Sequence, residues 1–392
     1  MRSVEELDVK GKRIFLRVDF NVPLTEQGEI RDDTRIRASL PTIAWLLDRG
    51  ARLVIASHLG RPKGKPDPKM SLRPATARLA ELVPNKVVQA PDVVGPEVAR
   101  LKAALGEGEA LVLENVRFVK AETDNDAAFA KELAEGIDIF VNDAFGSCHR
   151  AHASVTAIAG FVPVKAAGFL LKKEVDYLRK AVHDPAKPYV AILGGAKVED
   201  KIPVIENLLN KADDILIGGA MAYTFLKARG EDVGRSLVED DKREVALRIM
   251  AKAAGKNVRF LLPLDHVLAT AVDAGAETRV VEGTPFPAGF MGVDIGPKTV
   301  DAYARIIAGA RTIVWNGPLG VFEIDKFAEG TVRIARAVAA SGAVSIVGGG
   351  DSIAAIKKAG VEDRITHIST GGGASLEFLA YETLPGIEAL EK

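Results

Sequence analysis

The sequence is poor in cysteine, in net charge and in long apolar runs, and each shortage excludes a class of protein. Its 392 residues contain one cysteine, Cys148, which excludes an intramolecular disulfide framework and a cysteine-based zinc site. The formal net charge is −1, so no global positive field attracts nucleic acid or an anionic membrane. No run approaches the roughly 20 apolar residues of a membrane span, and the first residues lack the apolar segment of a secretion signal. We therefore expect a cytoplasmic enzyme or binding protein.

The length and the alternation of short apolar runs with helical stretches predict two α/β domains. A chain of 392 residues is too long for one ordinary core. Strand-like runs separated by helical segments indicate mostly parallel sheets, whose ligands bind beyond the carboxyl ends of the strands. Residues 160–188 start with glycine and proline, contain one helical pattern and end with two prolines. We interpret this stretch as a linker helix with hinges at its ends, between domains covering residues 1–168 and 169–376.

Polar and charged side chains follow the strand-like runs of the first half. The candidates for binding are Asp19, Asn21, Arg35, His58, Arg61, Arg117 and Arg150. A guanidinium fork matches two oxygens of a carboxylate or phosphate, so several arginines on one rim predict an anion pocket. Taken singly, each arginine has the alternative of a solvated surface group or ion-pair partner, and His58 that of a structural histidine.

Cys148 precedes His149, which raises the alternative of a nucleophilic cysteine with its base. Neighbours in sequence seldom point at each other, so we expect Cys148 to be a small buried thiol instead.

Glycine follows most strand-like runs of the second half. These turns are Gly194–Gly195, Gly218–Gly219, Gly317, Gly348–Gly350 and Gly371–Gly373. Together on one rim, they form a surface where backbone N–H groups approach a ligand closely. Such a rim suits a nucleotide, with phosphates over N–H groups and a flat base against small residues.

The segment 344–356 combines a strand, a glycine turn and a helix start. Val344–Val347 is typical of a buried parallel strand, and Asp351 and Ser352 are good N-cap residues for the helix that follows Gly348–Gly350. A carboxylate beside a phosphate site is explained by a bridging Mg²⁺ held by Asp351. The alternative is a tight turn in which glycine is only sterically convenient.

Lys197 and Lys201 are four residues apart, a spacing that places both ammonium groups on one helix face. Like charges so close favour a bound anion between them. The alternative is one solvent-facing lysine and one ion pair with Glu199 or Asp200. The segment matches neither a P-loop nor a dinucleotide-binding fingerprint.

These blocks together resemble the phosphoglycerate kinase family over essentially the whole chain. They occur in the family's order as RVDFNVP, HLGRP, ENVRF, SCHRAHAS, GGAKVEDKI, GGAMAYTF, WNGPLGVFE, GGGDS and STGGGASLE. Ser352 stands where the family often has threonine, and it keeps the hydroxyl. The resemblance implies two Rossmann-like domains with mostly parallel sheets, joined by the linker helix and separated by a cleft, with the tail 377–392 packed on the N-terminal domain.

The activity implied is a glycolytic transferase: reversible phosphoryl transfer between ATP and the carboxylate of 3-phosphoglycerate, giving ADP and 1,3-bisphosphoglycerate without a covalent enzyme intermediate. The family implies Mg²⁺ with the nucleotide, hinge bending, a cytoplasmic monomer, and small-molecule partners with no nucleic acid or membrane. By similarity, the seven polar candidates of the first half bind 3-phosphoglycerate. The nucleotide is implied to meet Gly195, Lys197, Lys201, Gly219, Gly292, Pro318, Val321, Glu323, Gly349, Gly350, Asp351 and Ser352. Asp351 holds the metal, and the catalytic groups are Arg35, Lys197 and the N–H groups of Gly350 and Gly373.

Two other functions compete with this interpretation. A sugar-phosphate dehydrogenase would need a dinucleotide fingerprint, which is not evident. A non-catalytic, hinge-bending anion-binding protein would explain the arginines of the first half. It would not explain Asp351, Lys197 and Lys201 beside glycine turns.

Overall fold

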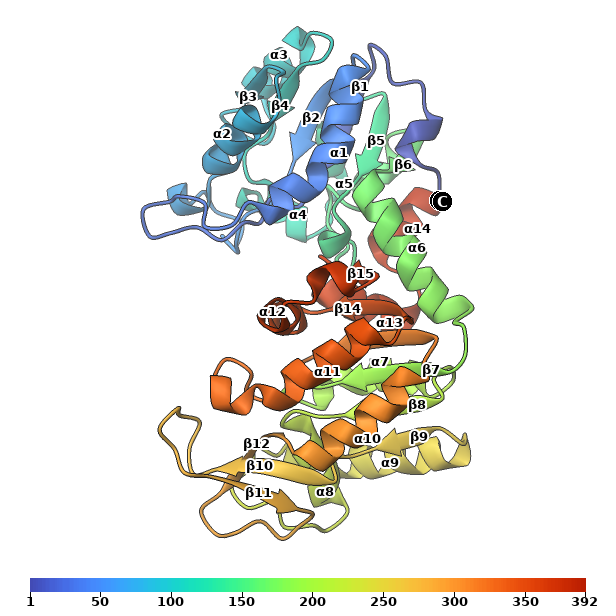
Figure 1. The fold of residues 1–392 in the computed structure, drawn as a ribbon. Helices are drawn as coiled ribbons and strands as arrows, with labels where there is room; N and C mark the ends of the chain where they lie inside the picture. Colours follow the sequence, from blue (N-terminus) through green and yellow to red (C-terminus); the bar gives the residue numbers. More distant parts are fainter. The chain divides into compact units, whose positions relative to one another are not determined.

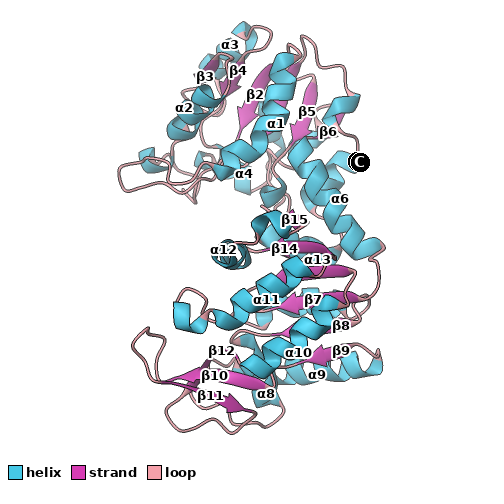
Figure 2. Cartoon of the chain, in the orientation of Figure 1, coloured by secondary structure: helices cyan, strands magenta, loops and turns pink.

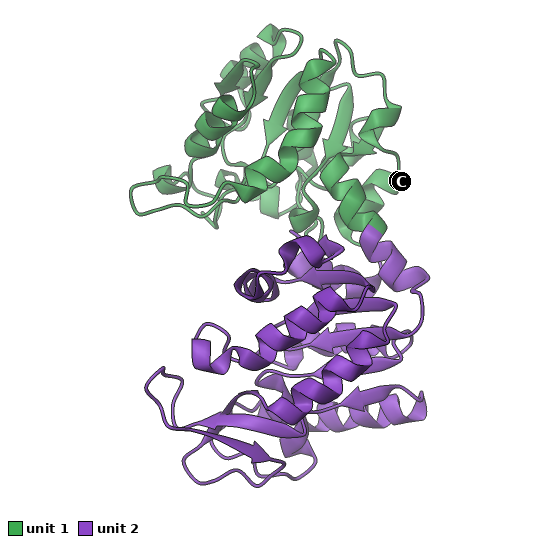
Figure 3. Ribbon diagram, in the orientation of Figure 1, with its two compact units in different colours: residues 1–176, 383–392 green, residues 177–382 purple.

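The computed structural model describes residues 1–392 and divides into two compact units (Figure 3). Unit 1 comprises residues 1–176 and 383–392, and unit 2 comprises residues 177–382. The division falls within α6 (Phe169–His183), the helix that the sequence predicted inside residues 160–188. No helix in the structure is both long enough and apolar enough to cross a membrane.

Unit 1 is built on a six-stranded sheet in which every pairing is parallel, with the strand order β3-β4-β2-β1-β5-β6. The strands are β1 (Arg13–Arg17), β2 (Arg52–Ala56), β3 (Val87–Gln89), β4 (Ala110–Val112), β5 (Ile139–Asn142) and β6 (Val164–Ala167). The helices besides α6 are α1 (Thr34–Asp48), α2 (Arg73–Leu82), α3 (Pro96–Ala104), α4 (Lys120–Thr123), α5 (Ala127–Ala134) and α14 (Pro385–Glu391), as labelled in Figure 1.

The core of unit 1 follows the two-residue period of its strands. Ile14 and Leu16 of β1 pack with the apolar stripes of α1 and α2 on one face of the sheet. Phe15 points to the opposite face, where its ring lies 6.2 Å from that of Phe140. Strands buried on both faces need near-continuous apolar runs, which is the pattern that the sequence shows.

The C-terminal helix α14 belongs to unit 1 through a close backbone contact. Pro385 occupies its first turn, and the N–H of Gly386 donates to the carbonyl of Cys148 at 2.9 Å. A Cβ on Gly386 would lie 2.9 Å from the Cα of Cys148, so this contact requires glycine. Cys148 is fully buried, as predicted, and burial raises the pKa of its thiol to about 12.

Unit 2 repeats the architecture with a second all-parallel sheet of six strands, in the order β15-β14-β13-β7-β8-β9. Its strands are β7 (Tyr189–Leu193), β8 (Asp214–Ile217), β9 (Arg259–Leu261), β13 (Thr312–Asn316), β14 (Val344–Gly348) and β15 (His367–Ile368). Its helices are α7 (Ile202–Leu208), α8 (Met221–Ala228), α9 (Arg243–Gly255), α10 (Pro297–Ala308), α11 (Glu329–Ala340), α12 (Gly350–Ala359) and α13 (Gly373–Tyr381). The predicted α/β class with mostly parallel sheets is therefore confirmed.

One face of this sheet carries α10, α11 and α12, whose apolar residues pack with Val190, Ile192 and Trp315. Alternate residues such as Ile215 and Ile217 point to the other face and are also fully buried. Because both faces of the sheet are covered, a ligand can reach the sheet at the ends of its strands.

A small antiparallel sheet in unit 2 was not predicted. It has the order β11-β10-β12 and consists of β10 (Asp265–Ala269), β11 (Thr278–Glu282) and β12 (Met291–Ile295), drawn as arrows in Figure 2. β9 ends at Leu261, before Pro263, and Asp265 starts a new strand.

Candidate functional site

The loops after β1, β2 and β4 of unit 1 form one connected surface. Their strands are parallel, so their carboxyl ends meet at the same edge of the sheet. The N–H of Phe20 donates to Ser57 Oγ at 2.8 Å, and the N–H of Gly60 donates to Asn21 Oδ1 at 2.8 Å. Arg117 Nη1 donates to the carbonyl of Gly60 at 2.9 Å. These bonds fix three loops relative to one another, and we call this surface the arginine edge.

Arg35, in the first turn of α1, is paired with Asp19 from the loop after β1. Burial opposes ionisation of Asp19, but the nearby His58, Arg35 and Arg17 and the N–H of Asn21 lower its pKa overall. The carboxylate therefore stays charged and orients the guanidinium, while 37% of the Arg35 side chain remains exposed. An oriented, partly exposed guanidinium is prepared to bind an anion.

Arg17, the last residue of β1, lies fully buried behind the arginine edge. Its Nε donates to Ser154 Oγ at 2.9 Å, and Ser154 Oγ lies 2.6 Å from Glu122 Oε1. Its Nη2 lies 3.2 Å from Nδ1 of His58. The sequence interpretation did not single out Arg17. The available signal was a charged residue inside the apolar run RIFLRV, because a buried charge requires dedicated partners.

Positive charge accumulates at this edge beyond what the nearby carboxylates offset. Burial, together with the charges of Arg17 and Arg150, lowers the pKa of Arg117 to about 10. Burial and the same arginines lower the pKa of His152 to about 4, and its Nδ1 has no hydrogen-bond partner. Several cations are thus held close together, and a bound anion would reduce the free-energy cost of their mutual repulsion.

Arg61 has a looser connection to this cluster than the other predicted residues. It is exposed and follows Gly60, whose amide and carbonyl bind Asn21 and Arg117. Arg150 is exposed too, but close enough to Arg117 to affect its pKa. The structure therefore brings the other predicted residues together and leaves Arg61 at the end of a fixed turn.

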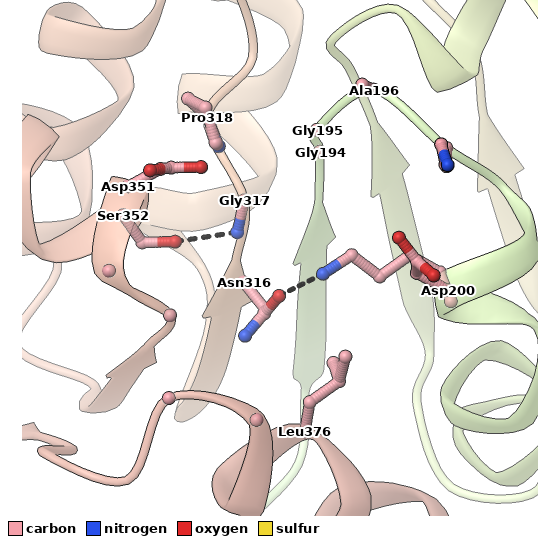
Figure 4. Close-up of a pocket in the computed structure, with 16 residues that line it drawn as sticks. Gly194, Gly195, Ala196, Asp200, Asn316, Gly317, Pro318, Asp351, Ser352 and Leu376 are labelled. Carbon is pink, nitrogen blue, oxygen red and sulfur yellow. Dashed lines mark hydrogen bonds between the residues drawn. The ribbon is translucent and has the colours of Figure 1, made fainter. Parts of the chain in front are cut away.

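The carboxyl edge of the large sheet in unit 2 contains a cavity of about 410 Å³ (Figure 4). It is lined by Gly194, Gly195, Ala196, Lys197, Asp200, Lys201, Asn316, Gly317, Pro318, Gly349, Gly350, Asp351, Ser352, Gly372, Gly373 and Leu376. Most of the predicted nucleotide-binding residues thus share one cavity, which we call the glycine cavity. Asn316 was not predicted as a site residue, although a polar residue at the end of the apolar run TIVW was a usable signal.

Two helices begin at the glycine cavity. α12 starts at Gly350 after Gly349, whose φ of 95° is strained for any residue but glycine. α13 starts at Gly373 after Gly372, whose φ is 51°. The first amides of a helix have no intrahelical acceptor and attract anions, so the two helix starts suit phosphate oxygens.

The predicted N-cap role of Asp351 and Ser352 is wrong. The N-cap of α12 is Gly349, because the chain must turn through positive φ there before the helix begins. The Ser352 hydroxyl instead accepts a hydrogen bond from the N–H of Gly317 at 2.6 Å, and Asp351 is exposed in the first turn. Ser352 therefore joins α12 to the loop after β13.

Lys197 and Lys201 do not share a helix face, contrary to the prediction. A turn after β7 carries Lys197, and Lys201 ends the 3₁₀ turn Glu199–Lys201. Both nevertheless line the glycine cavity. Lys201 donates to the side-chain oxygen of Asn316 (Figure 4), and burial lowers its pKa to about 8 against the opposing effect of two carboxylates. Glu199 pairs with Lys242 at 2.8 Å instead.

Four predicted residues lie outside the lining of the glycine cavity. Gly219 packs against the backbone of the glycine turn after β7, so it borders the cavity without lining it. Gly292 is in β12, and a Cβ there would lie 2.0 Å from the hydroxyl of Tyr223. Val321 packs with a separate apolar cluster, and Glu323 is exposed.

The glycine cavity offers carboxylates for a metal but no metal cage. Asp351 and Asp200 line it, and the structure contains no group of three or more His, Cys, Asp or Glu side chains arranged to hold a metal ion. Protein-bound Mg²⁺ usually keeps several waters and takes one or two carboxylates together with phosphate oxygens. The residues therefore fit a magnesium ion that arrives with a phosphate ligand.

Comparison with known proteins gives a consistent result. A family model described as phosphoglycerate kinase matches residues 4–382. The chain is 56% identical over 394 residues to the phosphoglycerate kinase of Anaeromyxobacter dehalogenans strain 2CP-C, with 100% of both chains covered. It is 57% identical to that of Koribacter versatilis strain Ellin345, covering 99% of this chain and 98% of the relative. Among solved structures, phosphoglycerate kinase from Coxiella burnetii matches with a TM-score of 0.91 and 43% identity, covering 99% of this chain and 98% of that chain.

Proposed function

Since the chain belongs to the phosphoglycerate kinase family, we propose that unit 1 binds 3-phosphoglycerate at the arginine edge and unit 2 binds a magnesium nucleotide in the glycine cavity. The reaction is reversible phosphoryl transfer between ATP and 3-phosphoglycerate, a step of glycolysis. The observation that carries the assignment of the two sites is their opposite chemistry. One edge gathers arginine side chains, and the other presents glycine turns, two helix starts and two lysines.

The arginine edge suits an acid with both a carboxylate and a phosphate. We assign 3-phosphoglycerate to Asp19, Asn21, Arg35, His58, Arg61, Arg117 and Arg150. The depressed pKa of Arg117 supports this assignment, because a bound anion would relieve the repulsion between the clustered cations. Asp19 would in addition orient Arg35.

In the glycine cavity, nucleotide phosphates would lie over the starts of α12 and α13 with Lys197 and Lys201 as counter-charges. Asp351 would hold the magnesium ion, whose positive charge offsets the phosphates. The base and ribose are assigned to Gly195, Gly219, Gly292, Pro318, Val321 and Glu323, with Glu323 accepting the ribose hydroxyls. Ser352 and Gly349 would shape the phosphate end of the site.

The chemistry needs no general base. The attacking carboxylate of 3-phosphoglycerate is ionised at pH 7, so the enzyme must position two anions and neutralise their charge. Arg35 and Lys197 would contact the transferring phosphoryl group from its two sides, and the N–H groups of Gly350 and Gly373 would donate to its oxygens. Because each substrate is assigned to a different unit, reaction requires the two units to approach, which also excludes water. We propose a monomer, because the assigned groups all come from this one chain, and a cytoplasmic location on the basis of the family.

Calorimetric titration of separate ligands tests the assignment. Arg117→Met is expected to weaken binding of 3-phosphoglycerate by roughly tenfold or more while leaving the affinity for ADP unchanged, since a charge-assisted contact is lost. Arg100→Met is the matched control, because Arg100 pairs only with Glu97 on the exposed face of α3. Loss of ADP affinity in Arg117→Met with intact binding of 3-phosphoglycerate would contradict the assignment.

A further inference from the structure

Arg17 is bonded through three different nitrogens, which fixes its guanidinium in the core of unit 1. Nε donates to Ser154 Oγ at 2.9 Å, Nη1 donates to the carbonyl of Val18, and Nη2 meets Nδ1 of His58 at 3.2 Å. The side chain is fully buried. A group held at three points in close packing has no second position to adopt.

Glu122 holds the hydroxyl of Ser154 in one orientation. Glu122 is fully buried and accepts from both the N–H of Ser154, at 2.9 Å, and the Ser154 hydroxyl, at 2.6 Å. Because the hydroxyl proton goes to Glu122, the Ser154 oxygen is left to accept from Arg17. The buried charges of Arg17 and Glu122 are thus linked by two hydrogen bonds through one hydroxyl group, that of Ser154.

The bond between Arg17 and His58 determines where the imidazole carries its proton. A guanidinium has five N–H donors and no acceptor, so Nδ1 of His58 must be the acceptor. A histidine that accepts at Nδ1 is neutral and carries its proton on Nε2. The ring of His58 has no other hydrogen-bond partner in unit 1, so Nε2–H remains available as a donor.

Burial acts in the same direction. It lowers the pKa of His58 well below the ordinary value; the charge of Asp19 opposes this effect, and the nearby Arg17, Arg117 and Arg35 add to it. Three cations and one anion therefore face the ring. The ring stays neutral in the neutral pH range.

We propose that Arg17 is a positioning residue that fixes the Nε2–H tautomer of His58, so that this ring is a permanent, uncharged hydrogen-bond donor to an anionic oxygen of 3-phosphoglycerate. The ligand in this inference rests on the proposed function of the arginine edge, whereas the tautomer does not. A donor that does not titrate binds its acceptor equally well across the physiological pH range. It also adds no charge to an edge that is already crowded with cations.

The tautomer is measured on the free enzyme. In protein labelled with ¹⁵N at histidine, two-bond proton–nitrogen correlations distinguish a protonated ring nitrogen from an unprotonated one. The expected result for His58 is an unprotonated Nδ1 and a protonated Nε2, unchanged between about pH 6 and pH 8. The His58→Gln variant assigns the signal by its loss. A protonated Nδ1, or a titration near the ordinary histidine pKa, would overturn the proposal.

Removal of the positioning group gives the second measurement. The double variant Arg17→Met/Glu122→Gln removes both buried charges together, so that neither is left without its counter-charge. We expect His58 to gain the second tautomer and to titrate. The KM for 3-phosphoglycerate should rise by roughly tenfold and become pH-dependent, with the KM for ATP unchanged. A rise in KM with the tautomer and pH profile of the wild type would reduce Arg17 to a structural role.

Two substitutions at position 58 keep the test valid if the double variant fails to fold. The amide nitrogen of Gln can occupy the place of Nε2, whereas that of Asn reaches only the place of Nδ1. We expect His58→Gln to keep the KM for 3-phosphoglycerate within about threefold of the wild type and His58→Asn to raise it roughly tenfold. Equal losses in both variants would overturn the donor role. If no variant of the arginine edge, Arg117→Met included, weakens the binding of 3-phosphoglycerate, the proposed function fails while the tautomer result stands.

Discussion

The hydroxyl of Ser352 accepts a hydrogen bond from the N–H of Gly317 at 2.6 Å, and this bond joins the first turn of α12 to the loop after β13. Both residues line the glycine cavity, and they follow β13 and β14, which are neighbours in the sheet. This buried hydroxyl, together with the bond from the Asn316 amide to the carbonyl of Gly348, therefore positions one helix start relative to the loop that carries Pro318.

Removing that hydroxyl should impair nucleotide binding. Ser352→Ala leaves the N–H of Gly317 buried without an acceptor, which costs about 1–3 kcal/mol of folding stability and should raise the KM for ATP by roughly tenfold. Ser352→Thr restores the hydroxyl and should recover most of the affinity. Ser341→Ala is the control, because that hydroxyl bonds only to the backbone of Val338 and Ala343, neither of which lines the glycine cavity. Equal KM values for ATP in Ser352→Ala and the wild type would show that the bond does not position the site.

Arg35 is expected to act in the transition state. Arg35→Ala should lower kcat by roughly 100-fold or more, because a cation that stabilises the transferring phosphoryl group is lost. Arg37→Ala is the matched control on the same helix, since Arg37 is more than half exposed and pairs with Asp33 one turn away. Steady-state kinetics in both substrates measure the effect. A large rise in KM with a modest change in kcat would assign Arg35 to ground-state binding instead.

Asp351 is expected to determine the magnesium dependence. Asp351→Asn should raise the Mg²⁺ concentration needed for half-maximal rate by roughly tenfold, because one carboxylate ligand becomes neutral. Asp363→Asn, an exposed carboxylate in the 3₁₀ turn Glu362–Arg364, should leave the dependence unchanged. Titration of activity with Mg²⁺ at fixed ATP gives the answer. The same midpoint in Asp351→Asn and the wild type would contradict the assignment.

Lys201 should couple proton uptake to nucleotide binding. Burial lowers the pKa of this ammonium to about 8 from an ordinary 10.5. The unfolded chain therefore binds more protons than the folded one between these values, and stability gains from this group as pH rises from 8 towards 10.5. Anionic phosphates favour the charged form, so ADP binding above pH 8 should take up protons and weaken as pH rises.

Calorimetry of ADP binding in buffers of different ionisation enthalpy measures that proton uptake. Lys201→Arg carries a guanidinium that does not titrate, and it should remove the uptake while retaining a positive charge. Proton uptake of the same size in Lys201→Arg would assign it to another group.

The alternation of apolar runs predicted the two parallel sheets, because strands buried on both faces must be apolar whatever their partners are. The two failures at the glycine cavity have local causes. Asp351 and Ser352 have strong N-cap propensities, but Gly349 turns the chain through positive φ first. Lys197 lies in the turn after β7, and the 3₁₀ turn Glu199–Lys201 separates it from α7, an irregular start that no helical period reveals.

Arg17 was missed for a different reason. Whether an arginine in an apolar run is exposed or buried is decided by its partners, and Ser154 lies 137 residues away in the sequence. The same holds for Gly292, whose need for glycine comes from the ring of Tyr223 on another element. Contacts of this kind become visible only when the chain has folded.

The contact of Gly386 with the loop of Cys148 has a consequence for the order of folding. Residues 383–392 follow unit 2 in the sequence, yet they complete unit 1. Because a chain is synthesised from its N-terminus, unit 1 lacks α14 until unit 2 has been made, and Gly386 packs against Cys148 and Val155 only then. A nascent chain that stops within unit 2 therefore carries an incomplete unit 1.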